Sequence, residues 1–378
     1  MRKTIKMLIV CSVIPFFLTG CWDQRLLKEQ KLISLIGYDM NSGGEIIAST
    51  AYPIRKGGVT TGSKSPPSSQ STILTTHGKT AQDSLLHADL KISERIDISK
   101  AQVILFGEKI AKVGLYQVID HIYRNPKGAL GAKVAIIEGS TVNAVNLKQE
   151  EADIIGRYYG EFLKSGVATG FFTDYNIQSV CPLLLKHTKD PLLPLLRIQP
   201  TQNRAVTVGM AMFNNEKMTG KLNIDESKMF TLLDGYKKQK VSFLVRTKKH
   251  YKNMQKNYVV IEVLGTKPKT KLNVENKSIT VDLSLKLHYR IIEYPKNHLT
   301  TPMLLDELNK AIKENLTQLA QQTITKMQEA NCDGFGIEEQ IKVYHHKLWE
   351  QKYKNTALKN IPIKPHLQFE LTNSGIID

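Results

Sequence analysis

The feature that most restricts how this chain can fold is a strict alternation of apolar and polar residues over 279–291. The apolar positions are Ile279, Val281, Leu283, Leu285, Leu287, Tyr289 and Ile291. Successive side chains of a β-strand point to opposite faces of the sheet. The pattern therefore predicts one long strand with a face in a hydrophobic core and a face toward solvent.

A segment with helical periodicity follows this strand. Thr301-Pro302 predicts the start of a helix, because proline is tolerated in the first turn. A stripe of mainly apolar residues then recurs at steps of three and four, namely Leu305, Leu308, Ile312, Leu316, Leu319, Thr323 and Met327. We expect this stripe to pack on the apolar side of the strand. A second helix is expected over 337–353, and a final strand around Leu367, Phe369 and Leu371.

Two further units precede this one. In the first, strands are expected at 32–39, 45–52, 72–76, 102–106 and 133–138, and helices at 108–124, 150–164 and 174–187. A second, β-rich unit contains strands at 205–213 and 218–222, followed by lysine-rich strands. We therefore predict an α+β fold of three domains, with mixed or antiparallel sheets and packed helices. The predicted domains are 21–198, 199–272 and 273–378.

The first residues have the composition of an export leader. Arg2, Lys3 and Lys6 precede an uncharged apolar run at 7–18, which is shorter than the roughly 20 residues of a membrane span. The run ends at Leu18-Thr19-Gly20-Cys21, which is similar to the lipobox of bacterial lipoproteins, whose cysteine receives a diacylglycerol. We predict a signal peptide at 1–20 and a lipid on Cys21. The alternative is an ordinary secretory signal with a chance cysteine.

Positive charge is concentrated in one part of the chain. Removing the leader lowers the net charge from +17 to +14, and residues 237–271 hold eleven Lys or Arg against Glu262 alone. Such a segment usually suggests nucleic acid, which an exported protein does not ordinarily meet. We expect a contact with anionic lipid or an acidic partner, since each cation near such a membrane contributes about 1 kcal/mol. The alternative is a pair of exposed strands whose lysines prevent edge aggregation.

The sequence contains no recognisable catalytic or metal-binding motif. Gly78-Lys79-Thr80 lacks the first glycine of a phosphate loop, and Gly334-Phe335-Gly336 lacks the third glycine of a dinucleotide loop. His345-His346 are adjacent, so on a helix they point apart. Cys181 and Cys332 are expected to be buried free thiols, with a disulfide as the alternative. We therefore predict a protein that is not an enzyme and has no cofactor and no metal.

Several short segments occur in a recognisable order after the leader. The first is Cys21-Trp22-Asp23-Gln24-Arg25, and the second is Leu35-Ile36-Gly37-Tyr38-Asp39. Gly209-Met210-Ala211-Met212-Phe213 and Asp333-Gly334-Phe335-Gly336 follow. Together they resemble the C-subunit lipoproteins of bacterial spore germinant receptors, the Ger(x)C family. That family more often has an aliphatic residue where Tyr38 stands.

The resemblance implies a protein of a sporulating Firmicute, anchored through Cys21 on the outer face of the spore inner membrane. It implies two membrane-embedded partner subunits in a receptor that senses nutrients and triggers germination. It supplies no catalytic residue. Trp22, Asp23 and Arg25 match the motif without a known role, and Trp22 suits either the headgroup level or a plain linker. A solute-binding lipoprotein of a membrane transport system and an envelope hydrolase are the alternative classes.

Overall fold

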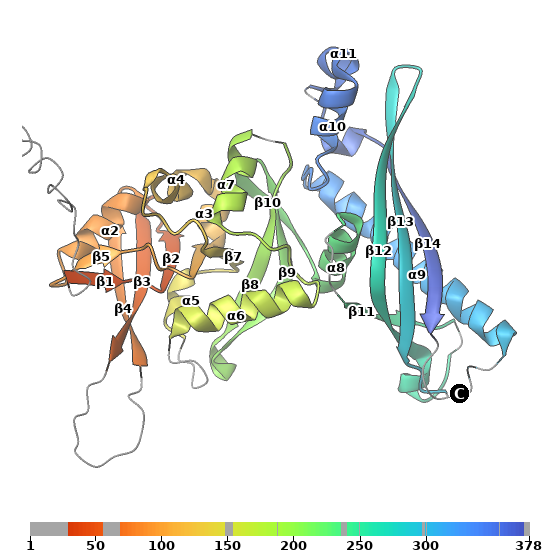
Figure 1. The fold of residues 1–378 in the computed structure, drawn as a ribbon, viewed down its shortest axis with the longest axis horizontal. Helices are drawn as coiled ribbons and strands as arrows, with labels where there is room; N and C mark the ends of the chain where they lie inside the picture. Colours follow the sequence, from red (N-terminus) through yellow and green to blue (C-terminus); the bar gives the residue numbers. More distant parts are fainter. Residues whose placement is uncertain are drawn as a thin grey trace, which may run out of the picture.

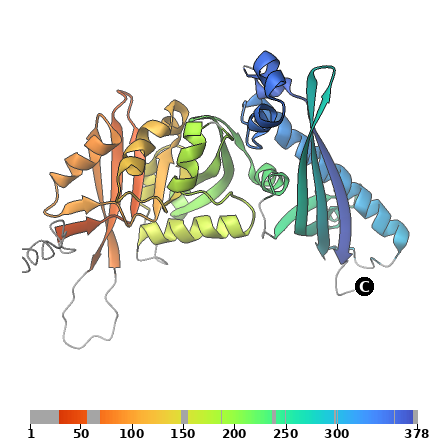
Figure 2. The same ribbon diagram turned by 45° about the horizontal axis from the view of Figure 1, so that its top comes forward.

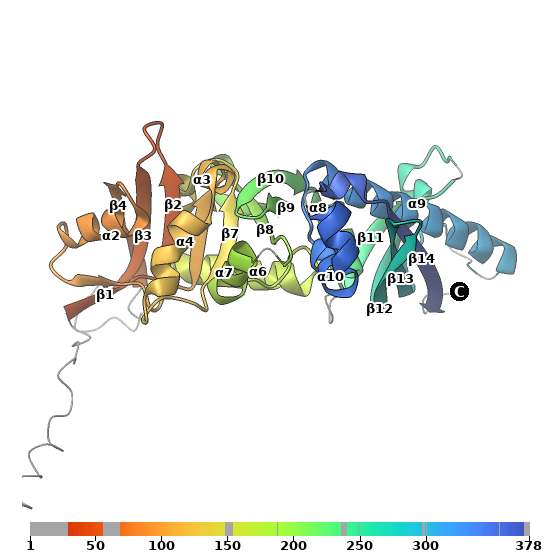
Figure 3. The same cartoon turned by 90° about the horizontal axis from the view of Figure 1, so that it is seen from above.

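The computed structural model describes residues 29–55, 69–147, 154–186, 188–235, 240–248, 250–296, 299, 301–354 and 356–373. The predicted leader at 1–20 and the motif residues Cys21, Trp22, Asp23 and Arg25 lie outside the described residues. Two lobes follow one another along the long axis of the molecule (Figures 1, 2 and 3). The N-terminal lobe is built on an eight-stranded sheet and the C-terminal lobe on a four-stranded sheet, which confirms the α+β class.

The larger sheet is mixed and has the strand order β10-β9-β8-β7-β6-β2-β3-β4. Its strands are β2 (Leu35–Met40), β3 (Ile46–Arg55), β4 (Ser69–Gly78), β6 (Val103–Gly107), β7 (Lys133–Ile137), β8 (Leu192–Gln199), β9 (Arg204–Asn214) and β10 (Lys217–Leu222). The four central strands, from β8 to β2, pair in parallel. Such strands are covered on both faces, so β6 is buried at every residue.

Helices cover both faces of the larger sheet (Figure 1). One face, with Tyr38 and Phe106, packs against α2 (Ala81–Asp89), α3 (Glu108–Val113), α4 (Tyr116–Arg124) and α7 (Ile177–Lys186). The other face, with Leu35 and Leu105, packs against α5 (Thr141–Val145) and α6 (Ile155–Ala168). A small parallel sheet of β1 (Gln30–Leu32) and β5 (Arg95–Asp97) lies beside it.

The smaller sheet has the order β11-β12-β13-β14. Its strands are β11 (Val241–Arg246), β12 (Tyr258–Glu275), β13 (Ser278–Glu293) and β14 (Ile363–Asn373). Asn276 and Lys277, both with positive φ, form the turn between β12 and β13. The predicted alternation is confirmed, because the seven apolar positions from Ile279 to Ile291 are all buried and the polar residues between them are not.

The long helix α9 (Pro302–Glu329) runs along one face of the smaller sheet (Figure 2). Leu308, Ile312 and Leu316 of the predicted stripe are buried against that face. The second predicted helix is interrupted at His345, whose ψ of 45° leaves the helical region. It is divided into α10 (Ile337–Tyr344), α11 (His346–Leu348) and the π-helical turn η4 (Trp349–Tyr353).

The residues predicted as a middle domain, 199–272, contribute to both sheets. β9 and β10 complete the larger sheet, whereas β11 and β12 begin the smaller one. The reason is that β9 turns back and pairs antiparallel with β8, which buries the apolar run at 210–213. Within the described residues this segment has no sheet of its own, and the three domain boundaries stay a prediction.

Cys181 and Cys332, the two cysteines in the described part of the chain, are free and buried. Cys181 belongs to the core beneath α4 and α7, and Cys332 to the core on the other face of the larger sheet. Burial raises the pKa of both thiols, so both stay protonated near neutral pH. The expectation of two buried thiols is confirmed.

Candidate functional site

Helix α8 (Ile224–Leu233) connects the two lobes and belongs to both cores. Phe230 packs in the core of the N-terminal lobe, whereas Met229 and Leu232 pack in the core of the C-terminal lobe. A helix with buried residues on two sides fixes the lobes against each other. The junction around α8 is therefore the candidate functional site.

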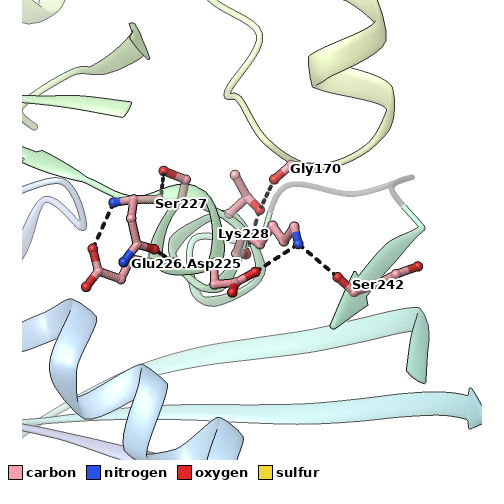
Figure 4. A network of polar contacts seen from close by, with 8 residues as sticks. Gly170, Asp225, Glu226, Ser227, Lys228 and Ser242 are labelled. Atoms are coloured by element: carbon pink, nitrogen blue, oxygen red, sulfur yellow. Dashed lines mark hydrogen bonds and ion pairs between the residues drawn. The ribbon is translucent and has the colours of Figure 1, made fainter. Parts of the chain in front are cut away.

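The first turn of α8 is closed by a capping box (Figure 4). The Asn223 side chain accepts a hydrogen bond of 2.9 Å from the Glu226 N–H, and Glu226 Oε2 accepts one of 2.8 Å from the Asn223 N–H. Glu226 is buried, and its Oε1 lies 2.6 Å from Nζ of Lys326 in α9. One carboxylate thus caps the connecting helix and holds it to the C-terminal lobe.

Lys228, in the next turn of α8, contacts both lobes, and Figure 4 shows its hydrogen bonds to Asp225 and Ser242. Its Nζ donates to Asp225 at 2.9 Å and to the carbonyl of Ser242 in β11 at 3.1 Å. The same ammonium lies 5.4 Å from the ring centres of both Phe171 and Phe243, one from each lobe. On the same side of the helix, the Thr231 hydroxyl donates to the carbonyl of Gly170 at 3.1 Å.

A second set of contacts crosses from one lobe to the other. It joins Asp190, just before β8, to Asp333, just before α10. Asp190 Oδ2 accepts from the Asp333 N–H and Oδ1 from the Asn215 N–H, each at 2.7 Å. The Asp190 N–H donates to the Asp333 carbonyl at 3.0 Å. Burial outweighs these two donors and raises the pKa of Asp190 to about 6. Asp333 in turn accepts from the N–H groups of Ile337 and Glu338, at the start of α10.

The segment Asp333-Gly334-Phe335-Gly336 fits closely into this crossing. A Cβ on Gly334 would lie 2.4 Å from Leu192 Cδ1. The absence of a side chain at Gly334 therefore lets Leu192 of β8 pack directly against this segment. The Phe335 ring packs on Phe230 of α8, with 5.3 Å between ring centres. Gly336 has a φ of 64°, which glycine adopts without strain. The residues that resemble a nucleotide loop are therefore the residues that hold the lobes together.

A polar cavity of about 470 Å³ lies beside the crossing, with Lys189, Asp190, Asp333 and Glu338 among its walls. Burial raises the pKa of Asp333 and Glu338 as well as that of Asp190. Most of these groups are already engaged, since Lys189 pairs with Asp234 at 2.5 Å and the two aspartates accept backbone N–H groups. No cluster of ligating side chains suited to a metal ion occurs in the described part of the chain.

The other segments singled out in the sequence also have local structural roles. Thr80 caps α2, with its hydroxyl accepting from the Asp83 N–H at 3.1 Å. Asp39 accepts from the Thr141 N–H and hydroxyl at the start of α5. Sequence reasoning did not single out Asp190, Lys228 or Glu226 as junction residues. The spacing Asn223-x-x-Glu226 was the one available signal, because it is that of a capping box.

The basic segment is distributed over several surfaces. Lys267, Lys269 and Lys271 of β12 are exposed, opposite Lys286, Ser284 and Asp282 of β13 on the open face of the smaller sheet. Lys248 pairs with Glu314 of α9 at 2.7 Å. These positions agree with lysine-rich exposed strands. The remaining described lysines of the segment are Lys240, just before β11, and Lys252 and Lys256, in the connection between β11 and β12.

The described helices include none that combines the length and apolar character of a membrane span.

Fold and junction together define a two-lobed α+β protein whose buried polar groups hold its lobes and helices in place. Residues 23–198 match the family described as the spore germination protein N-terminal domain. Residues 208–375 match the family described as spore germination B3/GerAC-like, C-terminal. The chain therefore belongs to the GerAC family of spore germination proteins.

Similar proteins agree with this assignment along the whole chain. Spore germination protein GerQC of Bacillus cereus is 23% identical over 376 residues, covering 97% of each chain. Spore germination protein KC of Bacillus subtilis (strain 168) is 23% identical over 414 residues, covering 98% of this chain and 96% of that protein. The crystal structure of the GerBC protein has the same fold, with a TM-score of 0.58 and 15% sequence identity. The match covers 89% of this chain and 97% of that chain.

Proposed function

We propose that this chain is the lipid-anchored C subunit of a nutrient germinant receptor that triggers spore germination. The observation that carries the proposal is the match to both family domains, over 23–198 and 208–375, which follows the predicted leader at 1–20 and Cys21. In this proposal Cys21 bears the lipid, and the two lobes stand on the outer face of the spore inner membrane. Two membrane-embedded receptor subunits are the partners.

The arrangement of polar groups favours a binding role without catalysis. Side chains brought together from distant parts of the chain, such as Asp190 with Asp333 and Glu226 with Lys326, bind backbone N–H groups or each other. Groups engaged in this way stabilise a fixed arrangement of the lobes. A rigid two-lobed body suits a subunit that holds other subunits in position.

A germination assay tests this proposal. Spores that lack this chain are expected to lose the response to the nutrients of one receptor, measured as release of dipicolinic acid and loss of refractility. Restoring the wild-type gene should restore the response, and germination by a route that needs no nutrient should be unchanged. The proposal is wrong if deletion leaves every nutrient response intact while deletion of the adjacent membrane-subunit genes abolishes one.

A further inference from the structure

One end of the smaller sheet, next to the β11–β12 connection, exposes a group of large apolar side chains. Leu244 of β11 is 64% exposed, and Met254, at the start of the short helix η3 (Met254–Asn257), is 72% exposed. With Tyr258, Val260 and Pro295 they line an open groove of about 630 Å³. Contiguous apolar side chains that are exposed to this degree are typical of interaction sites.

The strand register places these side chains on the open face of the sheet. Leu244 pairs with Val260, and the neighbours Phe243, Val245 and Val259 are buried in the core beneath α9. Because side chains alternate along a strand, Leu244 and Val260 point away from that core. The connection that carries Met254 projects from the sheet at the end of the C-terminal lobe (Figures 1 and 3).

Three cations neighbour the residues that line the apolar groove. Lys252 and Lys256 flank Met254 and are exposed, and neither makes an ion pair with any residue the structure describes. Arg246, also exposed, pairs with Tyr258 across the strands, so its side chain lies at the edge of the groove. Glu293 is the one acidic residue among the described residues that line the groove. An apolar centre with a cationic rim is complementary to an anionic, amphiphilic surface.

We propose that this surface, formed by Leu244, Arg246, Lys252, Met254, Lys256 and Tyr258, is a reversible contact with an anionic lipid bilayer. Leu244 and Met254 enter the apolar edge of the headgroup region, while Arg246, Lys252 and Lys256 contact lipid phosphates. The lipid anchor belongs to the proposed function and raises the local lipid concentration, but the contact forms without it. The contact gives the C-terminal lobe its own attachment, far along the long axis from β1 (Figure 1).

Vesicle binding by the full chain after the leader, residues 22–378 without lipid, tests the charge part of the contact. Wild type is expected to bind vesicles of phosphatidylglycerol and phosphatidylcholine at low salt, and not vesicles of phosphatidylcholine alone. Lys252→Glu with Lys256→Glu should weaken binding by about 30-fold or more, since each surface cation contributes about one factor of five. Lys347→Glu with Lys359→Glu, two exposed lysines elsewhere in the C-terminal lobe, changes the net charge equally and should leave most of the binding intact.

A fluorescence measurement tests insertion directly. After subtraction of the wild-type signal, which comes from Trp22 and Trp349, the emission of Met254→Trp is expected to shift to shorter wavelength on adding the same vesicles and to be quenched by brominated lipid. Met303→Trp is the matched control, because Met303 is 76% exposed at the start of α9 and outside the proposed surface. Its emission should not change. Both positions are exposed, so both variants should melt at the temperature of wild type.

Three results would overturn the proposal. The first is no binding of wild type to phosphatidylglycerol vesicles at low salt. The second is equal loss of binding in the two charge-reversed variants, which would mean that net charge alone acts. The third is no spectral change for Met254→Trp when the protein is bound to vesicles. That result would show that the groove does not insert into lipid and would favour an acidic protein as its partner. None of these results affects the receptor assignment, which the germination assay tests separately.

Discussion

Replacing Cys21 with alanine is expected to abolish incorporation of labelled palmitate and to release most of the chain from the membrane fraction. The Cys21 thiol is the predicted site of lipid attachment, and the apolar run at 7–18 is too short to replace it as a span. Two acyl chains hold a protein stably, at about 0.8 kcal/mol for each buried methylene. The variant should therefore move from the membrane pellet to the supernatant by immunoblot.

Cys11→Ala is the matched control for this experiment. Cys11 lies within the predicted leader, so cleavage before Cys21 would remove it from the finished protein. This control is expected to incorporate palmitate and to sediment with membranes as wild type does. Palmitate incorporation that persists unchanged in Cys21→Ala would show that the lipid is attached elsewhere.

Replacing Gly209 with alanine is expected to lower the free energy of unfolding by about 3 kcal/mol or more. Gly209 has a φ of 146°, a conformation that other residues rarely adopt. A Cβ there would lie 2.0 Å from the carbonyl oxygen of Leu222, in the backbone that leads directly into α8. Because that atom is backbone, the clash can be relieved only by moving the connecting helix away from β9. Urea unfolding measures the loss.

Gly131→Ala is the control for Gly209→Ala. Gly131 has an ordinary φ, and a Cβ on it would meet no atom within 4 Å. Its effect on the free energy of unfolding should stay within about 1 kcal/mol. If the two variants unfold at the same urea concentration, the close packing of α8 on β9 does not contribute to the stability of the junction.

The parts of the fold that were predictable have periodic sequences. The alternation over 279–291 defines a strand whose faces have different environments, and β13 has that register. The three- and four-residue steps after Pro302 likewise give α9 and its buried stripe. In both cases the repeat of apolar residues along the chain sets which side chains share a face. A short window of sequence is therefore enough to predict the element and its buried face.

The junction could not be predicted because its contacts depend on distant backbone groups. Asp190 and Asp333 are 143 positions apart, and each bonds to N–H groups, which any residue type provides. No side-chain pattern therefore reveals the pair. The division of 199–272 between two sheets has a similar cause. β9 belongs to the larger sheet because it pairs with β8, and the sequence of β9 alone does not identify that partner.

Asp333-Gly334-Phe335-Gly336 shows how a short motif is explained only in three dimensions. Its glycines suggest a ligand loop, but a missing third glycine argues against a dinucleotide. In the structure its aspartate accepts the N–H groups of α10, and its phenylalanine packs on α8. Each residue thus serves the joint between lobes, which a single sequence does not show.

The most direct test of the central claim is purification of the tagged chain from detergent-solubilised inner membranes of dormant spores, with quantification of the proteins that accompany it. The account predicts two integral membrane proteins in amounts comparable to the chain, and their loss when the strain carries Cys21→Ala. Recovery of the chain from the soluble fraction without membrane proteins would contradict the claim. Recovery with the permease subunits of a transporter would contradict it equally and would support a solute-binding lipoprotein instead.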